Sequence, residues 1–87
     1  MATLTFLSES KGFRYESENY TLTGNKVSRN DNFESIDGGA IMKDGQHIGT
    51  FYVRIETTPK ITLSNVDSSE FLAVYGVVKD LIDELWQ

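Results

Sequence analysis

The chain carries a single histidine, His47, and no cysteine, so any chemistry that needs an imidazole must use that one residue. An imidazole can act as a general base or can activate a serine nucleophile. No serine of the chain lies in a G-x-S-x-G sequence, the sharp turn that presents the nucleophile in α/β-hydrolases. His47 follows shortly after Asp44-Gly45, in a segment of strand-like alternation. We therefore interpret it as a strand residue near the rim of a sheet, and we expect no catalytic site and no enzymatic activity.

Carboxylates are the other side chains with chemical capacity. Asp80, Asp83 and Glu84 have the i, i+3, i+4 spacing that brings side chains close together on a helix surface. Acid catalysis or metal binding would require a cleft and further ligands, so we interpret these residues as a solvated helix face. The alternative is an acidic contact surface for a basic partner. The acidic segment 30–37 lacks the ligand spacing of an EF-hand, and we expect no cofactor and no metal.

The charge balance limits the classes of partner. Eight Lys and Arg against 13 Asp and Glu give a formal net charge of −5. Proteins that grip a phosphate backbone do so by neutralising phosphates with Lys and Arg, so duplex DNA or RNA is not expected as a direct partner. The same charge favours solubility and attraction to a basic protein surface. An acidic inhibitor that mimics a nucleic acid is a further alternative.

Length and composition predict one small domain in a reducing compartment. A chain of 87 residues supplies a single core, so we expect one domain over residues 1–87. Without cysteine, the fold must rest on apolar packing or on oligomerisation rather than on disulfides. The N-terminus lacks the pattern of a signal peptide, and no apolar run approaches the roughly 18 residues of a membrane span. We therefore expect a cytoplasmic protein with no membrane partner.

Alternation of apolar and polar residues predicts an antiparallel sheet of about four to six strands over residues 3 to about 63. Asp44-Gly45 is a strong two-residue hairpin signal because both positions tolerate positive φ, and Gly24-Asn25 is a weaker signal of the same kind. Pro59 precedes a further short strand. The expected strands are residues 3–8, 20–23, 26–29, 40–43, 46–56 and 61–63, with a loop at 16–19, a turn at 30–32 and a break at 37–39.

The C-terminal segment predicts an amphipathic helix over about residues 68–86. Asp67 is placed to cap the first amides, and Glu70 is placed to bond back in a capping box. Gly76 in mid-helix indicates either close approach of the helix to the sheet or simple tolerance of glycine. The fold class is therefore α+β, with the helix packed on one face of the sheet. Its predicted sheet-facing positions are Phe71, Val74, Tyr75, Val78, Leu81, Ile82 and Leu85.

The Asp44-Gly45 turn also predicts which side chains share a face of the sheet. A two-residue turn pairs Met42 with His47 and Ile41 with Ile48, and strand residues then alternate between faces. The predicted opposite face is unusually apolar, and three explanations are open: a loop such as residues 13–20 folds over it, a second copy of the chain or another protein packs on it, or a bulge at Gly49 changes the register and returns Ile48 to the core. The predicted core face is Met42, His47, Phe51, Val53 and Ile55, and the opposite face is Ile41, Ile48, Thr50, Tyr52 and Arg54.

These patterns favour a small intracellular protein-interaction module over an enzyme. We expect it to bind a protein partner or a second copy of itself, as a homodimer, through Ile41, Ile48, Tyr52 and Arg54, because Tyr and Arg are enriched at the centres of interfaces. The acidic residues Asp80, Asp83 and Glu84 would help to orient the partner. The alternative is a small-ligand or peptide-binding domain with a pocket between sheet and helix, lined by Phe51, Tyr75 and Trp86.

Overall fold

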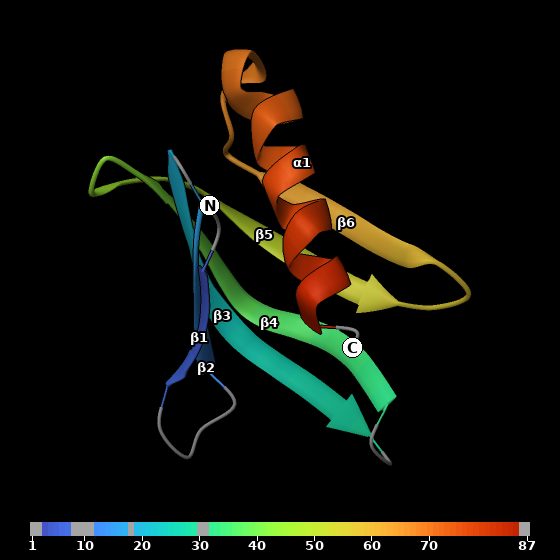
Figure 1. Cartoon of the computed structure of the whole chain (residues 1–87). Helices are drawn as coiled ribbons and strands as arrows, with labels where there is room; N and C mark the ends of the chain where they lie inside the picture. Colours follow the sequence, from blue (N-terminus) through green and yellow to red (C-terminus); the bar gives the residue numbers. More distant parts are fainter. Residues whose placement is uncertain (1–2, 8–11, 18, 30–31, 86–87) are drawn as a thin grey trace.

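The structure is a computed structural model that describes residues 3–7, 12–17, 19–29 and 32–85. The strands are β1 (Thr3–Leu7), β2 (Gly12–Glu16), β3 (Tyr20–Arg29), β4 (Asn32–Lys43), β5 (Gln46–Ile55) and β6 (Pro59–Ser64), and the helix is α1 (Ser68–Leu85). The strands pair antiparallel in chain order, so β1 and β6 are the edges of an open sheet. Helix α1 lies across one face of this sheet (Figure 1). The predicted α+β fold class is confirmed.

The core lies between α1 and the sheet face beneath it. Residues of neighbouring strands stand opposite one another on this face, as in the row formed by Leu4, Tyr15, Leu22 and Ile41. Burying one large apolar side chain is worth about 1.5–3 kcal/mol of transfer free energy, so α1 is the main cover of the sheet. Its buried side chains are Val74, Val78, Leu81, Ile82 and Leu85.

The outer face of the sheet, opposite α1, is polar rather than apolar. Threonines occupy outer positions on β1, β3, β5 and β6. One row of cross-strand neighbours on this face runs through Thr5, Arg14, Thr23, Ala40, Thr50 and Ser64. A face of this composition needs no cover from another layer, because antiparallel sheets commonly keep one face in water. The apolar second face that the sequence predicted is therefore absent from the described residues.

The turn predicted at Gly24-Asn25 is wrong. Strand β3 passes through this position without turning, and it pairs with β4 on either side of an irregularity. A Cβ atom at Gly24 would stand 3.1 Å from Ile36 Cγ2 and 3.3 Å from the Asp37 carbonyl oxygen. Glycine is present because β4 approaches closely. The break predicted at residues 37–39 likewise lies inside the continuous strand β4, and the turn predicted at 30–32 falls mostly outside the described residues.

The hairpin at Asp44-Gly45 is confirmed, and a bulge follows it. Asp44 has φ +52° and Gly45 has φ +80°, as a type I′ turn requires. Lys43 pairs with Gln46 and Met42 with His47, but Ile41 pairs with Gly49. Ile48 is the extra residue, and it packs against the core.

This bulge corrects the predicted faces. Because one extra residue reverses the alternation, Ile41 moves into the core, where its exposure is 0%, and Met42 and His47 move to the outer face. Phe51 and Val53 keep their predicted places in the core. The explanation by a bulge beside Gly49 is thus the one that the structure contains.

Contacts from the sheet fix both ends of α1. At the N-terminus, Glu70 does not form the predicted capping box: its carboxylate accepts hydrogen bonds from Tyr20 Oη at 2.9 Å and from Lys43 Nζ at 2.7 Å. At the C-terminus, Lys26 Nζ donates to the Leu85 carbonyl oxygen at 2.9 Å. A cation at this end also complements the helix dipole. The two lysines therefore tie both ends of α1 to the sheet.

Two details of the helix itself were also predicted. Asp67 caps the first turn as expected, since its Oδ1 accepts a hydrogen bond from the Ser69 amide at 3.1 Å. Gly76 does not mark a close approach to the sheet, because a Cβ atom there would meet nothing within 4 Å.

Acid is expected to loosen the N-terminal end of α1. The hydrogen bonds from Lys43 and then Tyr20 hold the pKa of Glu70 below its usual value. A carboxylate with a depressed pKa stabilises the fold above its unfolded pKa of about 4.3, and this contribution is lost as pH falls through the folded value. Urea unfolding at several pH values should therefore show a larger loss of stability between about pH 5 and pH 3 for the wild type than for Glu70→Gln. Equal losses in both proteins would contradict this role of Glu70.

Candidate functional site

The structure separates the four residues predicted to form an interface. Ile41 is fully buried under α1, and Ile48 packs against the same core from its bulge. Tyr52 and Arg54 do lie exposed on the outer face, where Tyr52 is 44% accessible. Ile41 and Ile48 were misplaced because the bulge was not included in the predicted register. Tyr52 and Arg54 stand among polar neighbours such as Thr62, which pairs with Tyr52.

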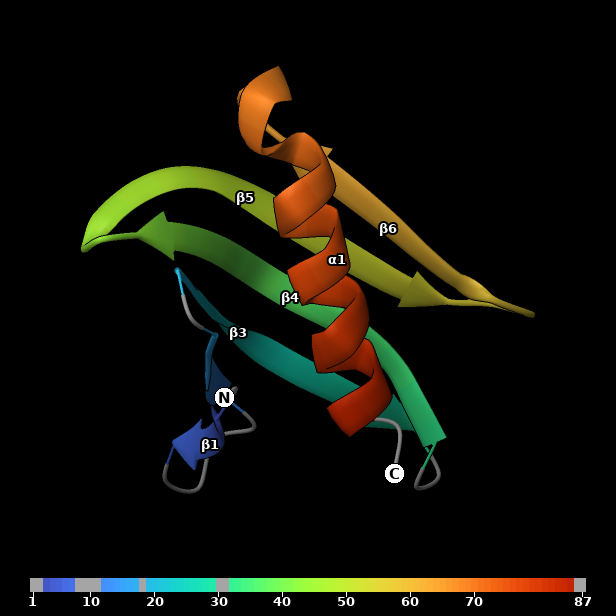
Figure 2. The ribbon, with the colours of Figure 1, turned by 45° about the horizontal axis from the view of Figure 1, so that its top comes forward.

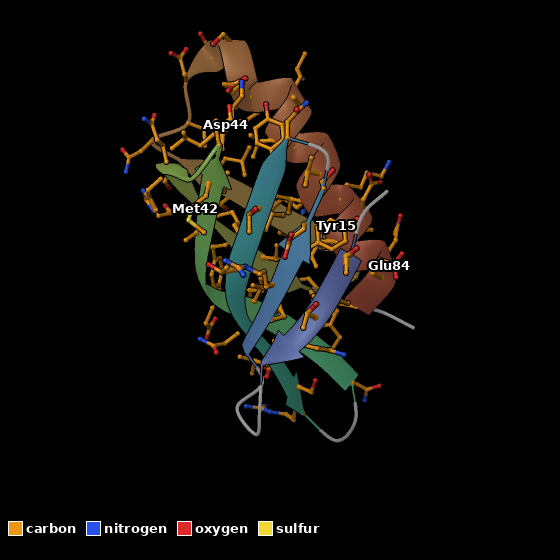
Figure 3. All side chains as sticks on the ribbon, turned by 60° about the vertical axis from the view of Figure 1, so that its left-hand side comes forward. Tyr15, Met42, Asp44 and Glu84 are labelled. Carbon is orange, nitrogen blue, oxygen red and sulfur yellow. The ribbon has the colours of Figure 1, made fainter. Side chains whose placement is uncertain are left out.

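The three acidic residues are exposed, as predicted, but they do not all lie on one side of α1. Asp83 borders a hollow next to β6. Glu84 lies toward β2, on the side of Tyr15 (Figure 3). Burial raises the pKa of Tyr15, and the negative charges of Asp80, Glu84 and Asp83 raise it further. The acidic residues therefore flank the helix on two sides.

His47 lies exposed at the turn end of β5, opposite Met42. Within the part of the chain that the structure describes, no group of three or more His, Asp or Glu side chains could hold a metal ion. The same residues include no helix that is both long and apolar enough to cross a membrane.

One hollow in the described part of the chain is an open wedge between α1 and β6. Figure 2 shows the two elements diverging from the connection between them toward the Pro59 end of β6. The cavity has a volume of about 350 Å³. We call it the α1/β6 wedge, and it is lined by Pro59, Ile61, Tyr75, Lys79, Ile82 and Asp83.

Three large apolar side chains stand exposed on the first half of α1. Phe71 is 41% accessible, Leu72 84% and Tyr75 42%. The rings of Phe71 and Tyr75 stack with centroids 6.5 Å apart, so they present one continuous apolar surface. We call these three residues the aromatic knob. Single exposed apolar residues are ordinary on a protein surface, but a contiguous group is a mark of an interaction site.

The edge strand β6 borders both features. It pairs with β5 on one side, and the sheet ends on its other side. Ile61 and Leu63 are half-buried on the face that α1 covers, and they stand opposite Val53 and Phe51 of β5. An edge strand presents backbone groups on which another chain can pair. Knob, wedge and edge thus form one surface on the β6 side of the helix.

Sequence reasoning missed this surface because Phe71 and Tyr75 belong to the apolar stripe of the helix and were predicted to be buried. The sequence does contain one signal, since Leu72 is a large apolar residue outside that stripe. Only one of the three residues predicted to line a ligand pocket lines the wedge in the described part of the chain. Tyr75 lines the wedge, Phe51 lies in the core at 3% exposure, and Trp86 falls outside the described residues.

No family model matches this chain, and neither a curated protein nor a solved structure is significantly similar to it.

Proposed function

We propose that this protein is a protein-interaction module that docks another polypeptide chain on the surface formed by the aromatic knob, the α1/β6 wedge and the edge of β6. The observation that carries the proposal is the exposure of Phe71, Leu72 and Tyr75 beside an apolar cavity. Contiguous apolar surface of this kind is costly to leave in water, and covering it supplies binding energy.

The composition of the surface favours a polypeptide partner. Aromatic side chains are enriched at the centres of protein interfaces, and Tyr75 belongs to both the knob and the wedge. The half-buried Ile61 and Leu63 would lose their remaining exposure if a further strand were laid along β6. The outer face offers less apolar surface, because Thr62 stands opposite Tyr52 and both Ser35 and Lys60 stand opposite Arg54.

Site-specific cross-linking tests this proposal with a matched pair of tyrosines. Tyr75 and Tyr52 have nearly equal exposure, 42% and 44%, but they lie on opposite faces of the sheet. The purified protein would carry the photoreactive residue p-benzoylphenylalanine at position 75 or at position 52. Each would be mixed with a lysate of its source cells, irradiated, and read out by mass spectrometry. The proposal predicts a recurrent polypeptide adduct at position 75 and none at position 52.

Competition makes the outcome specific. Excess wild-type protein should suppress adducts at position 75 to other proteins, or should itself become the cross-linked chain where the partner is a second copy, whereas excess Tyr75→Glu protein, checked for folding by circular dichroism, should do neither. Adducts only at position 52, or adducts that both competitors suppress equally, would contradict the proposal.

A small ligand in the α1/β6 wedge is the second candidate, because a cavity of about 350 Å³ reaches the size range of small-molecule sites. Lys79 and Asp83 at its border could bind opposite charges on an amphipathic compound. This candidate predicts that some members of a fragment library raise the melting temperature of the wild type but not of Ile61→Arg. A library without any such member would count against it.

A further inference from the structure

The knob and the wedge adjoin along the same edge strand and share Tyr75. The wedge is bordered by Pro59 and Ile61, at the start of β6. The knob follows the short connection from the end of β6 into α1, and this connection packs on β5, since a Cβ atom at Gly49 would stand 2.7 Å from Val66 Cγ2. Helix α1, which carries the knob and one wall of the wedge, lies over one face of the sheet (Figure 2). A projection and a hollow therefore stand side by side along one edge.

This arrangement is complementary to itself. If two copies pair β6 with β6 antiparallel, the two-fold axis stands perpendicular to the sheet and keeps both helices on the same face. The start of one β6 then meets the end of the other. The knob of each copy is thereby brought over the wedge of its partner. We infer that the polypeptide bound at the proposed docking surface is a second copy of this chain, in a two-fold dimer joined along β6. This inference rests on the proposed function.

One local pair of charges favours this pairing and acts against the repulsion between two chains of net charge −5. The knob end carries the exposed carboxylate of Asp67, and the wedge carries the ammonium group of Lys79 beside the carboxylate of Asp83. The two-fold axis places the acidic end of one copy near the cation of the other. An unrelated partner would have to supply the same order of shapes and charges, whereas a second copy supplies it by symmetry.

The edge itself limits the strength of the dimer. Pro59 lacks an N–H donor and Lys60 carries a charge, and both residue types are common protections against edge pairing. They occupy the first two positions of β6, so the pairing segment is short and centred near Thr62. Side-chain contacts of the knob must then provide most of the affinity. The dimer is expected to be weak, and its population rises with concentration.

A single introduced cysteine tests the geometry in this cysteine-free chain. Thr62 is exposed on the outer face of β6, away from the knob and the wedge. Residues on the axis of an antiparallel pair have Cα atoms about 4.5–5.5 Å apart, which suits a disulfide. Thr62→Cys should therefore form a disulfide-linked dimer under mild oxidation. Thr5→Cys, an exposed threonine on the other edge strand, is the matched control and should remain a monomer.

Analytical ultracentrifugation of the wild type, Tyr75→Glu and Tyr52→Glu completes the test. The wild type and Tyr52→Glu should move from monomer to twice the monomer mass as concentration rises. Tyr75→Glu should weaken the association by about 30-fold or more, the effect of removing a central interface residue.

Failure of the inference is distinguishable from failure of the proposed function. A wild type that stays monomeric at all concentrations, with cross-links from position 75 to a different protein, would overturn the dimer and leave the docking surface in place. A monomer without cross-links at position 75 would overturn both. Equal oxidation of Thr5→Cys and Thr62→Cys would overturn the pairing along β6.

Discussion

Leu81→Ala is expected to lower the free energy of unfolding by about 2–5 kcal/mol, the usual cost of truncating a buried leucine. Leu81 lies at 0% exposure at the centre of the contact between α1 and the sheet. Domains of this size have a total stability of roughly 5–15 kcal/mol, so the variant should approach the limit of folding. Urea denaturation followed by circular dichroism measures the change.

Leu72→Ala is the matched control, because Leu72 is on the same helix but 84% exposed. It should alter the stability of the monomer by no more than about 0.5 kcal/mol. As a member of the aromatic knob, Leu72 should instead affect association. Similar losses of monomer stability in both variants would contradict the placement of α1 on the sheet.

Gly39→Ala is expected to destabilise the fold by about 1–3 kcal/mol or more, the range for overpacked cores. A Cβ atom at Gly39 would stand 2.8 Å from two carbons of the Phe51 ring and still closer to the Phe51 carbonyl oxygen. Phe51 is buried at 3% exposure and cannot move away without disturbing its neighbours. Thermal unfolding should show a lowered melting temperature.

Gly76→Ala is the same chemical change, but it is expected to have the opposite effect on stability. The position is helical and a Cβ atom there meets nothing within 4 Å, so alanine should stabilise α1 by about 1 kcal/mol. Destabilisation by both substitutions to the same extent would show that the close approach at Gly39 is not the cause.

The sequence predicted those parts of the fold that depend on local chemistry. Asp44-Gly45 forms the expected hairpin because a type I′ turn needs positive φ at both positions. Asp67 predicted the start of α1, and five of the seven residues of the apolar stripe form its buried face, while Phe71 and Tyr75 are exposed. The turn predicted at Gly24 was wrong because glycine occurs both in turns and where two strands pack closely. Only the close approach of β4 distinguishes these two cases.

The proposed interaction surface could not be predicted from the sequence, for two physical reasons. A single bulge at Ile48 reverses the faces on β4 and the turn end of β5, and no local signal beyond Gly49 marks it. The exposure of Tyr75 depends on the diagonal path of α1, and this path involves contacts between residues far apart in the sequence, such as the bond from Lys26 to the Leu85 carbonyl and the packing of the buried helix residues. Periodicity shows which residues share a helix face, but it does not show how far the sheet extends beneath them.

Exposed apolar surface is present, but at a different place from the one that the sequence predicted. The apolar outer face that motivated self-association does not exist in the described residues, but apolar surface is exposed on the β6 side of α1. The proposed partner therefore contacts the edge strand β6 and the β6 side of α1, and not the flat outer face of the sheet.

The most direct test is to record amide chemical shifts of the wild-type protein from dilute to concentrated solution. The dimer proposal predicts that the shifts that change with concentration belong to β6, to the adjoining strand β5 and to residues 71–83, while the outer-face residues Arg14 and Thr23, on strands that do not adjoin β6, stay constant. Changes that cluster around Arg14 and Thr23, or spectra that are identical at every concentration, would contradict it.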